Sequence, residues 1–360
     1  MSEILDELQE KVNLCSFNDT NKLEDFVKLR NDIDGILNSQ IKVENGLTFS
    51  EMVKTHINVV KKRASDKKIT CGDNLLDSVI PNPQAGIVSI VGYSGSMKST
   101  YVHHLCRLRI IKKLPTVLFN TELSDEGIMD SITPIMIKEN ISDIMGMYND
   151  DEHIDYETIL DKYKQLETKY KDMDNFLYYP KHHVSIEEFK EFCKYARKKF
   201  NLKKDDLLFV FVDIMTMIEE FNKGTNRTDA IKLGMDALNE FVLEENIILF
   251  GTAQLNRPKT VHIKSEEDID KFRMSASDIK DSAEIENRSR LLLGIFNRKN
   301  IVDKNPCDPI VKELTEPILD LTVLKNTYTN TLGERIYYLI SSEYKSLIPY
   351  PNYVEENNVE

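Results

Sequence analysis

Several features that would define other classes of protein are missing from this 360-residue sequence. No apolar run approaches the roughly 18 consecutive residues that a membrane-spanning helix needs. The N-terminal MSEILDELQEKVNLCSF lacks the charged and then apolar pattern of a signal sequence. The five cysteines are scattered and include no CxxC pair, so neither a zinc site nor a disulfide framework is expected. These absences favour a cytoplasmic protein that makes no contact with a membrane.

Positive charge is also scarce, since 47 Lys and Arg stand against 60 Asp and Glu and give a net charge of −13. A protein that coats nucleic acid with its whole surface should be basic. An acidic chain can still bind DNA if its cations converge on one channel, as in a ring. The charge therefore disfavours general coating and leaves a local nucleic-acid channel open.

The periodicity of the sequence divides the chain into three parts. Residues 1–66 repeat apolar positions every three or four residues, which predicts a short helical segment that serves as a linker or docks on a partner. The polar stretch SDKKITCGDNLL marks a boundary, and residues 67–350 are expected to form one domain. Residues 351–360 form an acidic tail.

Within 67–350, compact apolar runs alternate with helical stretches, which predicts an α/β fold with a mostly parallel sheet flanked by helices. A C-terminal β-hairpin is expected at the sheet edge, and the charged region 135–180 is expected to be a helical surface excursion. The predicted strands are GIVSIVG, TVLFNTE, LLFVFVDI, NIILFGTA and RLLLGIF, and the helices include TYVHHLCRLRII, SIEEFKEFCKYARKKF and DAIKLGMDALNEFVLEE.

The stretch GYSGSMKST nearly matches a phosphate-binding loop, but it lacks the second glycine of GxxxxGK[ST]. It lies between a predicted strand and a predicted helix, as such a loop requires, and its backbone N–H groups would surround a phosphate. Lys98 would add charge at the β- and γ-phosphates, and Ser99 would ligate Mg²⁺. The predicted nucleotide-binding residues are Gly92, Ser94, Gly95, Ser96, Met97, Lys98, Ser99 and Thr100.

Met97 occupies the position of the missing glycine. A side chain is tolerable there if the backbone φ is negative and the side chain points away from the phosphates. The sequence does not show which backbone conformation Met97 adopts.

Three more polar residues follow apolar strands and should meet the loop at one edge of the sheet. Asp213 would hold Mg²⁺, although a lone acid at a strand end is usually a turn residue. Glu122 would activate the attacking water, unless it is only a helix-capping acid beside Ser124. Gln254 would contact the γ-phosphate.

These residues together resemble the RecA-like ATPase core of DnaB-type replicative helicases, over about residues 69–340. The stretch RMSASDIKDSAEIENRSRLLLGIFNR is the most diagnostic part, because it resembles DnaB more than RecA recombinases. The resemblance implies ATP and Mg²⁺ as cofactors, single-stranded DNA as a ligand, a homo-oligomer, expected to be a hexamer, and a helicase loader or primase as a partner. It also implies that Lys325, on the final hairpin, reaches the nucleotide of a neighbouring subunit.

The sequence departs from this family pattern in three places. One is Met97, which stands at the position of the motif's second glycine. Phage recombinases similar to UvsX also carry a bulky apolar residue at that position. Another is Thr327, which stands where the family has a finger arginine; Arg288, Arg290 and Arg298 are conceivable replacements or ordinary surface residues. The third is the N-terminal segment, which is too short for the usual N-domain. Met97 and the short N-terminal segment suggest a phage-type protein, which would act in the host cytoplasm.

By position, two loops would face DNA in the channel of a ring. One offers Lys223, Asn226 and Arg227 after the Asp213 strand, and the other offers Arg257 and Lys259 after Gln254. Neither loop is strongly basic, so these charges could equally be solvated surface residues. The pair His103-His104 is interpreted as structural.

The sequence therefore predicts an ATP-dependent, ring-forming DNA helicase. A recombinase filament that pairs strands is one alternative, and a nucleotide-gated scaffold with weak hydrolysis is another. Both alternatives keep the same nucleotide site.

Overall fold

The computed structural model describes residues 49–64, 69–147, 155–181, 183–222, 226–255, 262–274, 283–329 and 331–350. The chain forms two compact units, Met1–Lys68 and Ile69–Glu360. The first unit contains α3 (Phe49–Ala64), which confirms the helix predicted there; the other helices predicted in this segment lie outside the described residues.

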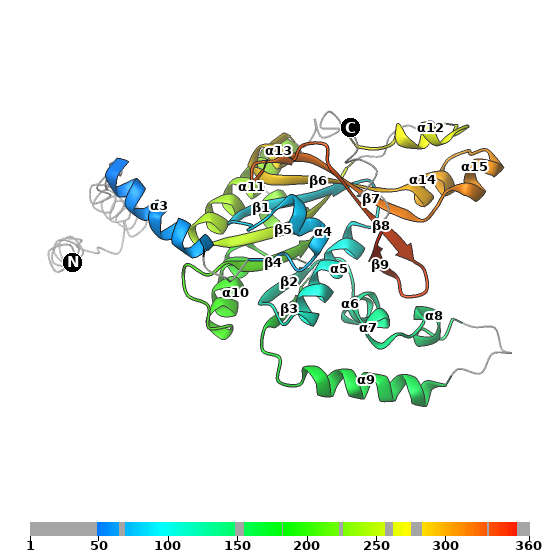
Figure 1. Cartoon of the computed structure of the whole chain (residues 1–360), viewed down its shortest axis with the longest axis horizontal. Coiled ribbons are helices and arrows are strands. Elements are labelled where there is room, and N and C mark those ends of the chain that lie inside the picture. Colours follow the sequence, from blue (N-terminus) through cyan, green and yellow to red (C-terminus); the bar gives the residue numbers. More distant parts are fainter. Residues whose placement is uncertain are drawn as a thin grey trace, which may run out of the picture. The chain divides into compact units, whose positions relative to one another are not determined.

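Within the described residues, the second unit is built on a nine-stranded sheet with the order β3-β2-β4-β5-β1-β6-β7-β8-β9 (Figure 1). The strands from β3 to β6 pair in parallel, and β7, β8 and β9 continue the sheet antiparallel. The predicted mostly parallel sheet with a C-terminal hairpin is confirmed. The strands are β1 (Gly86–Gly92), β2 (Thr116–Asn120), β3 (Phe176–Pro180), β4 (Leu208–Asp213), β5 (Ile247–Gln254), β6 (Ser289–Asn297), β7 (Ile318–Asn326), β8 (Arg335–Ser341) and β9 (Ser346–Pro349).

Helices cover both faces of this sheet, and its central strands are therefore buried along their whole length. One apolar cluster joins the sheet to α4 and α5, and a second joins it to α10 and α11. The remaining helices are short or peripheral. The helices are α4 (Asn74–Val79), α5 (Lys98–Ile111), α6 (Asp125–Ile132), α7 (Pro134–Ile137), α8 (Ile141–Ile144), α9 (Tyr156–Tyr170), α10 (Ile186–Lys199), α11 (Arg227–Glu244), α12 (Glu266–Asp270), α13 (Ala283–Arg288), α14 (Arg298–Lys304) and α15 (Pro309–Leu314).

The prediction for residues 135–180 was incomplete. The region does contain surface helices, among them α9, but it ends in β3, a strand at the sheet edge. The residues of β3 are mostly half-buried, because only one side of an edge strand is paired. FLYYP therefore lacks the long apolar run by which the central strands were recognised.

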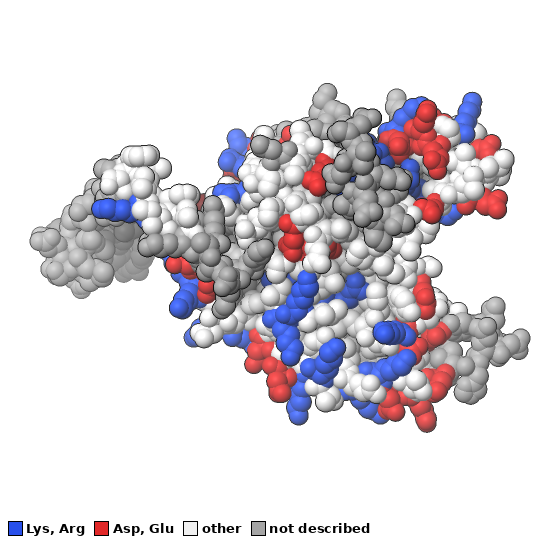
Figure 2. All heavy atoms as spheres, viewed as in Figure 1, with Lys and Arg blue, Asp and Glu red and all other residues white. Residues whose placement is uncertain are grey.

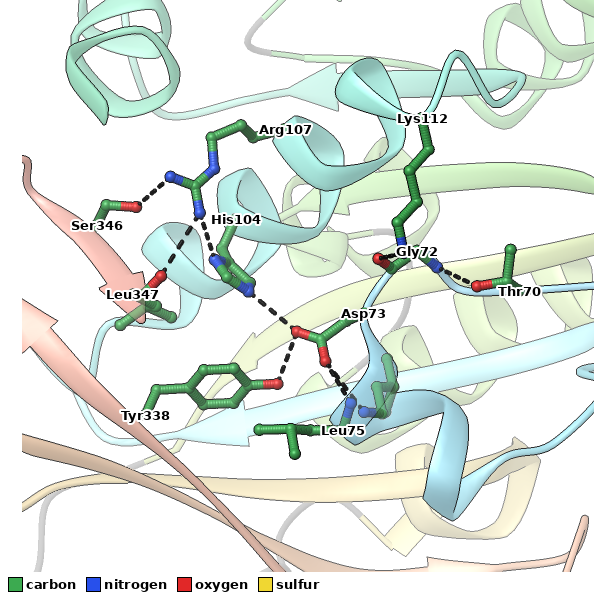
Figure 3. Close-up of polar contacts among 11 residues, drawn as sticks. Thr70, Gly72, Asp73, Leu75, His104, Arg107, Lys112, Tyr338, Ser346 and Leu347 are labelled. Atoms are coloured by element: carbon green, nitrogen blue, oxygen red, sulfur yellow. Dashed lines mark hydrogen bonds and ion pairs between the residues drawn. The ribbon is translucent and has the colours of Figure 1, made fainter. Parts of the chain in front are cut away.

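A buried polar network fixes α5 to the C-terminal hairpin (Figure 3). Asp73, which caps the N-terminus of α4, accepts hydrogen bonds from His104 Nε2 at 3.0 Å and from the Tyr338 hydroxyl at 2.8 Å. Arg107 donates to His104 Nδ1 at 2.8 Å and to Ser346 Oγ at 2.7 Å. Since arginine only donates, His104 carries its proton on Nε2. His104 is thus a structural residue, as interpreted from the sequence.

Candidate nucleotide-binding site

The loop Tyr93–Met97 joins the carboxyl end of β1 to the first residue of α5. Lys98 opens α5 and is buried, and its Nζ donates to the carbonyl oxygens of Gly92 at 3.0 Å and Tyr93 at 2.9 Å. Ser96 Oγ is buried without a hydrogen-bond partner among the described residues. The strand, loop and helix thus have the geometry that lets backbone N–H groups and a helix N-terminus meet a phosphate.

The backbone of Met97 does not meet the condition of a negative φ, because its φ is +70°. This left-handed conformation is the one that favours glycine, so methionine is strained at this position. The side chain packs on the apolar cluster that contains α4 and α5. The loop therefore keeps the backbone shape of a glycine-containing loop although the glycine is absent.

Asp213 ends β4 and is completely buried. The Thr252 hydroxyl donates to its Oδ1 at 3.0 Å, whereas Oδ2 has no hydrogen-bond partner in the described part of the chain. Burial raises the pKa of Asp213, and the hydroxyls of Ser99 and Thr252 and the charge of Lys98 oppose this rise. A buried carboxylate oxygen without a partner is costly unless something binds it.

This arrangement fits a divalent cation. A free carboxylate oxygen of Asp213 near the Ser99 hydroxyl provides the hard oxygen ligands that Mg²⁺ prefers. No group of three or more His, Cys, Asp or Glu that could hold a metal by itself occurs among the described residues.

Glu122 and Gln254 lie at the same sheet edge. Asn120, the last residue of β2, is the register partner of Asp213. Glu122 lies two residues beyond Asn120, and its negative charge acts to raise the pKa of Lys98. Ser124 caps α6 by accepting from the Gly127 N–H at 3.2 Å, so Glu122 is not the cap. Gln254 is the register partner of Gly92 and is exposed.

Burial lowers the pKa of the Lys98 ammonium to about 8, although the carboxylates of Asp213 and Glu122 act in the opposite direction. The structure therefore brings together the lysine and both acids that the sequence singled out. Their chemical roles stay predictions.

Lys325 lies on β7, and its Nζ donates to the carbonyl oxygens of Glu286 at 2.6 Å and Asn287 at 3.2 Å near the end of α13. Thr327 donates through its N–H and hydroxyl to the Arg290 carbonyl oxygen. Within one subunit, these two residues are therefore not part of the loop cluster.

The three arginines considered as replacements for a finger have different surroundings. Arg288 pairs with Asp236 at 2.6 Å, and Arg298 pairs with Asp270 at 3.3 Å. The guanidinium of Arg290 lies over the Tyr328 ring at 5.9 Å.

The predicted DNA-binding residues fall mostly on parts of the chain that are not described. Lys223, Arg257 and Lys259 lie outside the described residues, as does the side chain of Arg227. Asn226 is exposed and caps α11 by accepting from the Asp229 N–H at 2.9 Å. On the face shown in Figure 2, described Lys and Arg side chains are interspersed with Asp and Glu.

Two features of the site were missed by the sequence reasoning. Ile214 directly follows Asp213 with φ +71°, an unusual conformation for a β-branched residue that marks strain beside the acid. Asn300 and Lys304 on α14 lie against Gly95 of the loop. No motif signalled either feature, although the i, i+4 spacing of an amide and a lysine is visible in RKNIVDK.

The fold and the position of the loop define a RecA-like domain. The model of the DnaB-like helicase C terminal domain family matches residues 69–332, and the chain belongs to that family. A search of curated proteins found no match.

Two solved structures are similar to this chain in fold. One of them, described as an ATPase domain, aligns with a TM-score of 0.66 and 13% identity, covering 85% of this chain and 100% of that one. "The Structure Of A DnaB-Like Replicative Helicase And Its Interactions With Primase" aligns with a TM-score of 0.63 and 13% identity, covering 96% of this chain and 75% of that one. No helix in the described residues is long and apolar enough to cross a membrane.

Proposed function

We propose that this chain is an ATP-dependent replicative DNA helicase of the DnaB type, which assembles as a homo-hexameric ring and moves along single-stranded DNA. The observation that carries the proposal is the meeting of Lys98, Asp213 and Glu122 at the loop, in a chain of the DnaB-like family. The overall charge of −13 is compatible with DNA binding only through a local channel.

Each residue of the site has a distinct role in this proposal. The loop N–H groups and Lys98 bind the phosphates, and Ser99 and Asp213 hold Mg²⁺, which neutralises charge on the phosphates. Glu122 accepts a proton from the attacking water because it is exposed and lies close to Lys98. Gln254, beside Gly92, contacts the γ-phosphate and transmits its loss to the loop that follows.

The proposed function implies three kinds of partner: single-stranded DNA, a primase or loader, and further copies of this chain. Single-stranded DNA would contact the loops that contain Lys223, Asn226, Arg227, Arg257 and Lys259. One of the two similar structures is described as a DnaB-like replicative helicase and its interactions with primase, which supports a primase or loader as a partner. Oligomerisation would complete the site through Lys325 of a neighbouring subunit.

The proposal is tested by steady-state ATP hydrolysis with and without single-stranded DNA. Turnover that DNA stimulates is expected, and Lys98→Ala should lower it roughly hundredfold or more, because the phosphate charge is no longer neutralised. Glu122→Gln should bind MgATP but not hydrolyse it, since an amide cannot accept the proton. Absence of nucleotide binding by the wild-type chain would refute the proposal.

Two observations favour a second candidate, a nucleotide-gated scaffold with weak hydrolysis. Lys325 is bonded to carbonyl oxygens of its own chain, and Thr327 replaces the arginine that resemblance to the family leads one to expect. MgATP binding with negligible turnover, unaffected by DNA, would support this candidate. Open filaments on DNA in electron microscopy would instead support a recombinase.

A further inference from the structure

Two side chains of α14 lie against the tip of the phosphate loop. A Cβ placed on Gly95 would overlap Nζ of Lys304 and would lie 3.3 Å from both side-chain polar atoms of Asn300. The two residues are four apart on one helix and therefore share a face. Gly95 itself has φ +79°, so the loop is shaped and left bare of a side chain where α14 approaches.

The other charged residues of α14 are occupied elsewhere. Arg298 pairs with Asp270, Asp303 pairs with Lys312, and Lys299 donates to the Lys312 carbonyl oxygen at 2.8 Å. Lys304 is exposed and has no ion pair or hydrogen bond within the described residues. Its ammonium thus lies beside the loop, and no acid among the described residues pairs with it.

The charges around the loop indicate what Lys304 could bind. Lys98 alone faces the carboxylates of Asp213 and Glu122, in a chain whose net charge is −13. The proposed Mg²⁺ offsets part of this negative charge, and a second cation beside the loop would further favour binding of an anionic polyphosphate. Lys304 is a cation of the same chain that lies beside the loop.

The side of the loop from which Lys304 comes decides what it can touch. In the sheet, β6 and β4 lie on opposite sides of β1, and α14 follows β6 whereas Asp213 ends β4. Lys304 therefore approaches from the flank opposite the two acids, which face the γ-phosphate in the proposed reaction. Since the proposed reaction puts the γ-phosphate on the side of the acids, the α- and β-phosphates are the ones left for Lys304 to contact.

We infer that Lys304 is a second phosphate-binding cation of the nucleotide site, with Asn300 beside it on the same face of α14. Lys304 contacts the α- and β-phosphates of both ATP and ADP. This inference rests on the proposed function. Lys304 binds nucleotide in both the substrate and the product state, so it contributes to affinity and not to the hydrolysis step.

The test is calorimetric titration of the full-length protein with MgATP and with MgADP, for the wild type and for Lys304→Ala. Loss of a charged hydrogen bond at a partly exposed position should weaken the binding of both nucleotides by about tenfold. In steady-state turnover, KM should rise by a similar factor while kcat stays within about twofold. Lys304→Arg should restore most of the affinity, because it keeps the charge.

Lys299→Ala is the matched control, since it removes a lysine from the same helix without touching the loop. It should bind both nucleotides like the wild type. If the wild type binds MgATP and Lys304→Ala binds equally well, this inference fails while the proposed function stands. If the variant loses affinity for ATP but not for ADP, the assigned contact is wrong. If the wild type binds no nucleotide, the proposed function itself fails.

Discussion

The ammonium of Lys98 is held in a site that excludes most water but keeps two carboxylates within electrostatic range. Burial lowers the pKa of Lys98 more than the two carboxylates raise it, and the pKa falls to about 8. The lysine that should bind phosphate therefore changes its charge close to physiological pH. This property makes its proposed role measurable without altering the chain.

Nucleotide affinity should depend on pH through Lys98. Phosphate binds the ammonium and not the neutral amine, so affinity should be constant below pH 8 and should fall as pH rises through about 8, by up to about tenfold per pH unit. Titration with MgADP between about pH 7 and pH 9.5 measures this decline. Lys98→Arg keeps its charge throughout and should show a flat profile. A flat profile for the wild type would contradict the account.

Met97 provides a test of backbone strain. Its φ of +70° costs roughly 1–2 kcal/mol for any residue except glycine. Met97→Gly loses the packing of the side chain but removes the strain, whereas Met97→Ala loses the packing and keeps the strain. Urea unfolding should therefore show the glycine variant more stable than the alanine variant by about 1 kcal/mol. The opposite order would mean that the loop does not hold this conformation.

At the scale of elements, α5 has two functions. Its first turn carries Lys98 and Ser99, and its middle turns carry His104 and Arg107, which join it to Asp73 and to the hairpin β8–β9 (Figure 3). Burial alone would raise the pKa of Asp73, but the hydrogen bonds from His104 and Tyr338 hold it below its ordinary value. The hairpin at the end of the chain thus stabilises the helix that starts at the loop.

Removing one hydroxyl should weaken this network without disturbing its packing. Tyr338→Phe keeps the ring against Tyr101 and His104 but leaves the buried Asp73 carboxylate with one fewer donor. A loss of about 2 kcal/mol in the free energy of unfolding is expected. Tyr195→Phe, at an exposed position, should change stability by less than about 0.5 kcal/mol and serves as the control. Equal stability of the two variants would exclude a structural role for the Tyr338 hydroxyl.

Sequence patterns predicted the elements whose residues are buried on both sides. The strands β1, β4 and β5 consist mostly of apolar residues, so their existence and their parallel pairing followed from the sequence. The half-buried β3 was not recognised, because its burial depends on a neighbour distant in sequence.

The same limit applies at the candidate site. Lys98, Asp213 and Glu122 follow strands and were found by position, whereas the approach of Lys304 to Gly95 depends on how α14 packs. The positive φ of Met97 is also a property of the folded loop and has no signature in the residue itself.

At the scale of the whole molecule, the proposed ring makes activity a property of the assembly. Lys325 donates to carbonyl oxygens near the end of α13, so in the proposed ring it would reach a nucleotide across a subunit boundary. Specific ATPase activity should therefore rise with protein concentration. Native mass spectrometry with ATP should show hexamers as the active species.

Mixing inactive variants tests the shared site. Lys98→Ala and Lys325→Ala subunits should each be nearly inactive alone, and equal mixing leaves about one quarter of interfaces with both lysines intact. Partial recovery of turnover is therefore expected. A monomer with concentration-independent turnover and no recovery on mixing would exclude the ring.

The most direct measurement is the separation of a forked DNA duplex with a single-stranded tail. The wild-type chain should release the displaced strand when ATP and Mg²⁺ are present, and not when ATP is replaced by ADP. Glu122→Gln should bind the fork and the nucleotide but release no strand. If the wild type hydrolyses ATP on the fork and the duplex stays intact, or if strands are exchanged instead of separated, the chain is not a helicase.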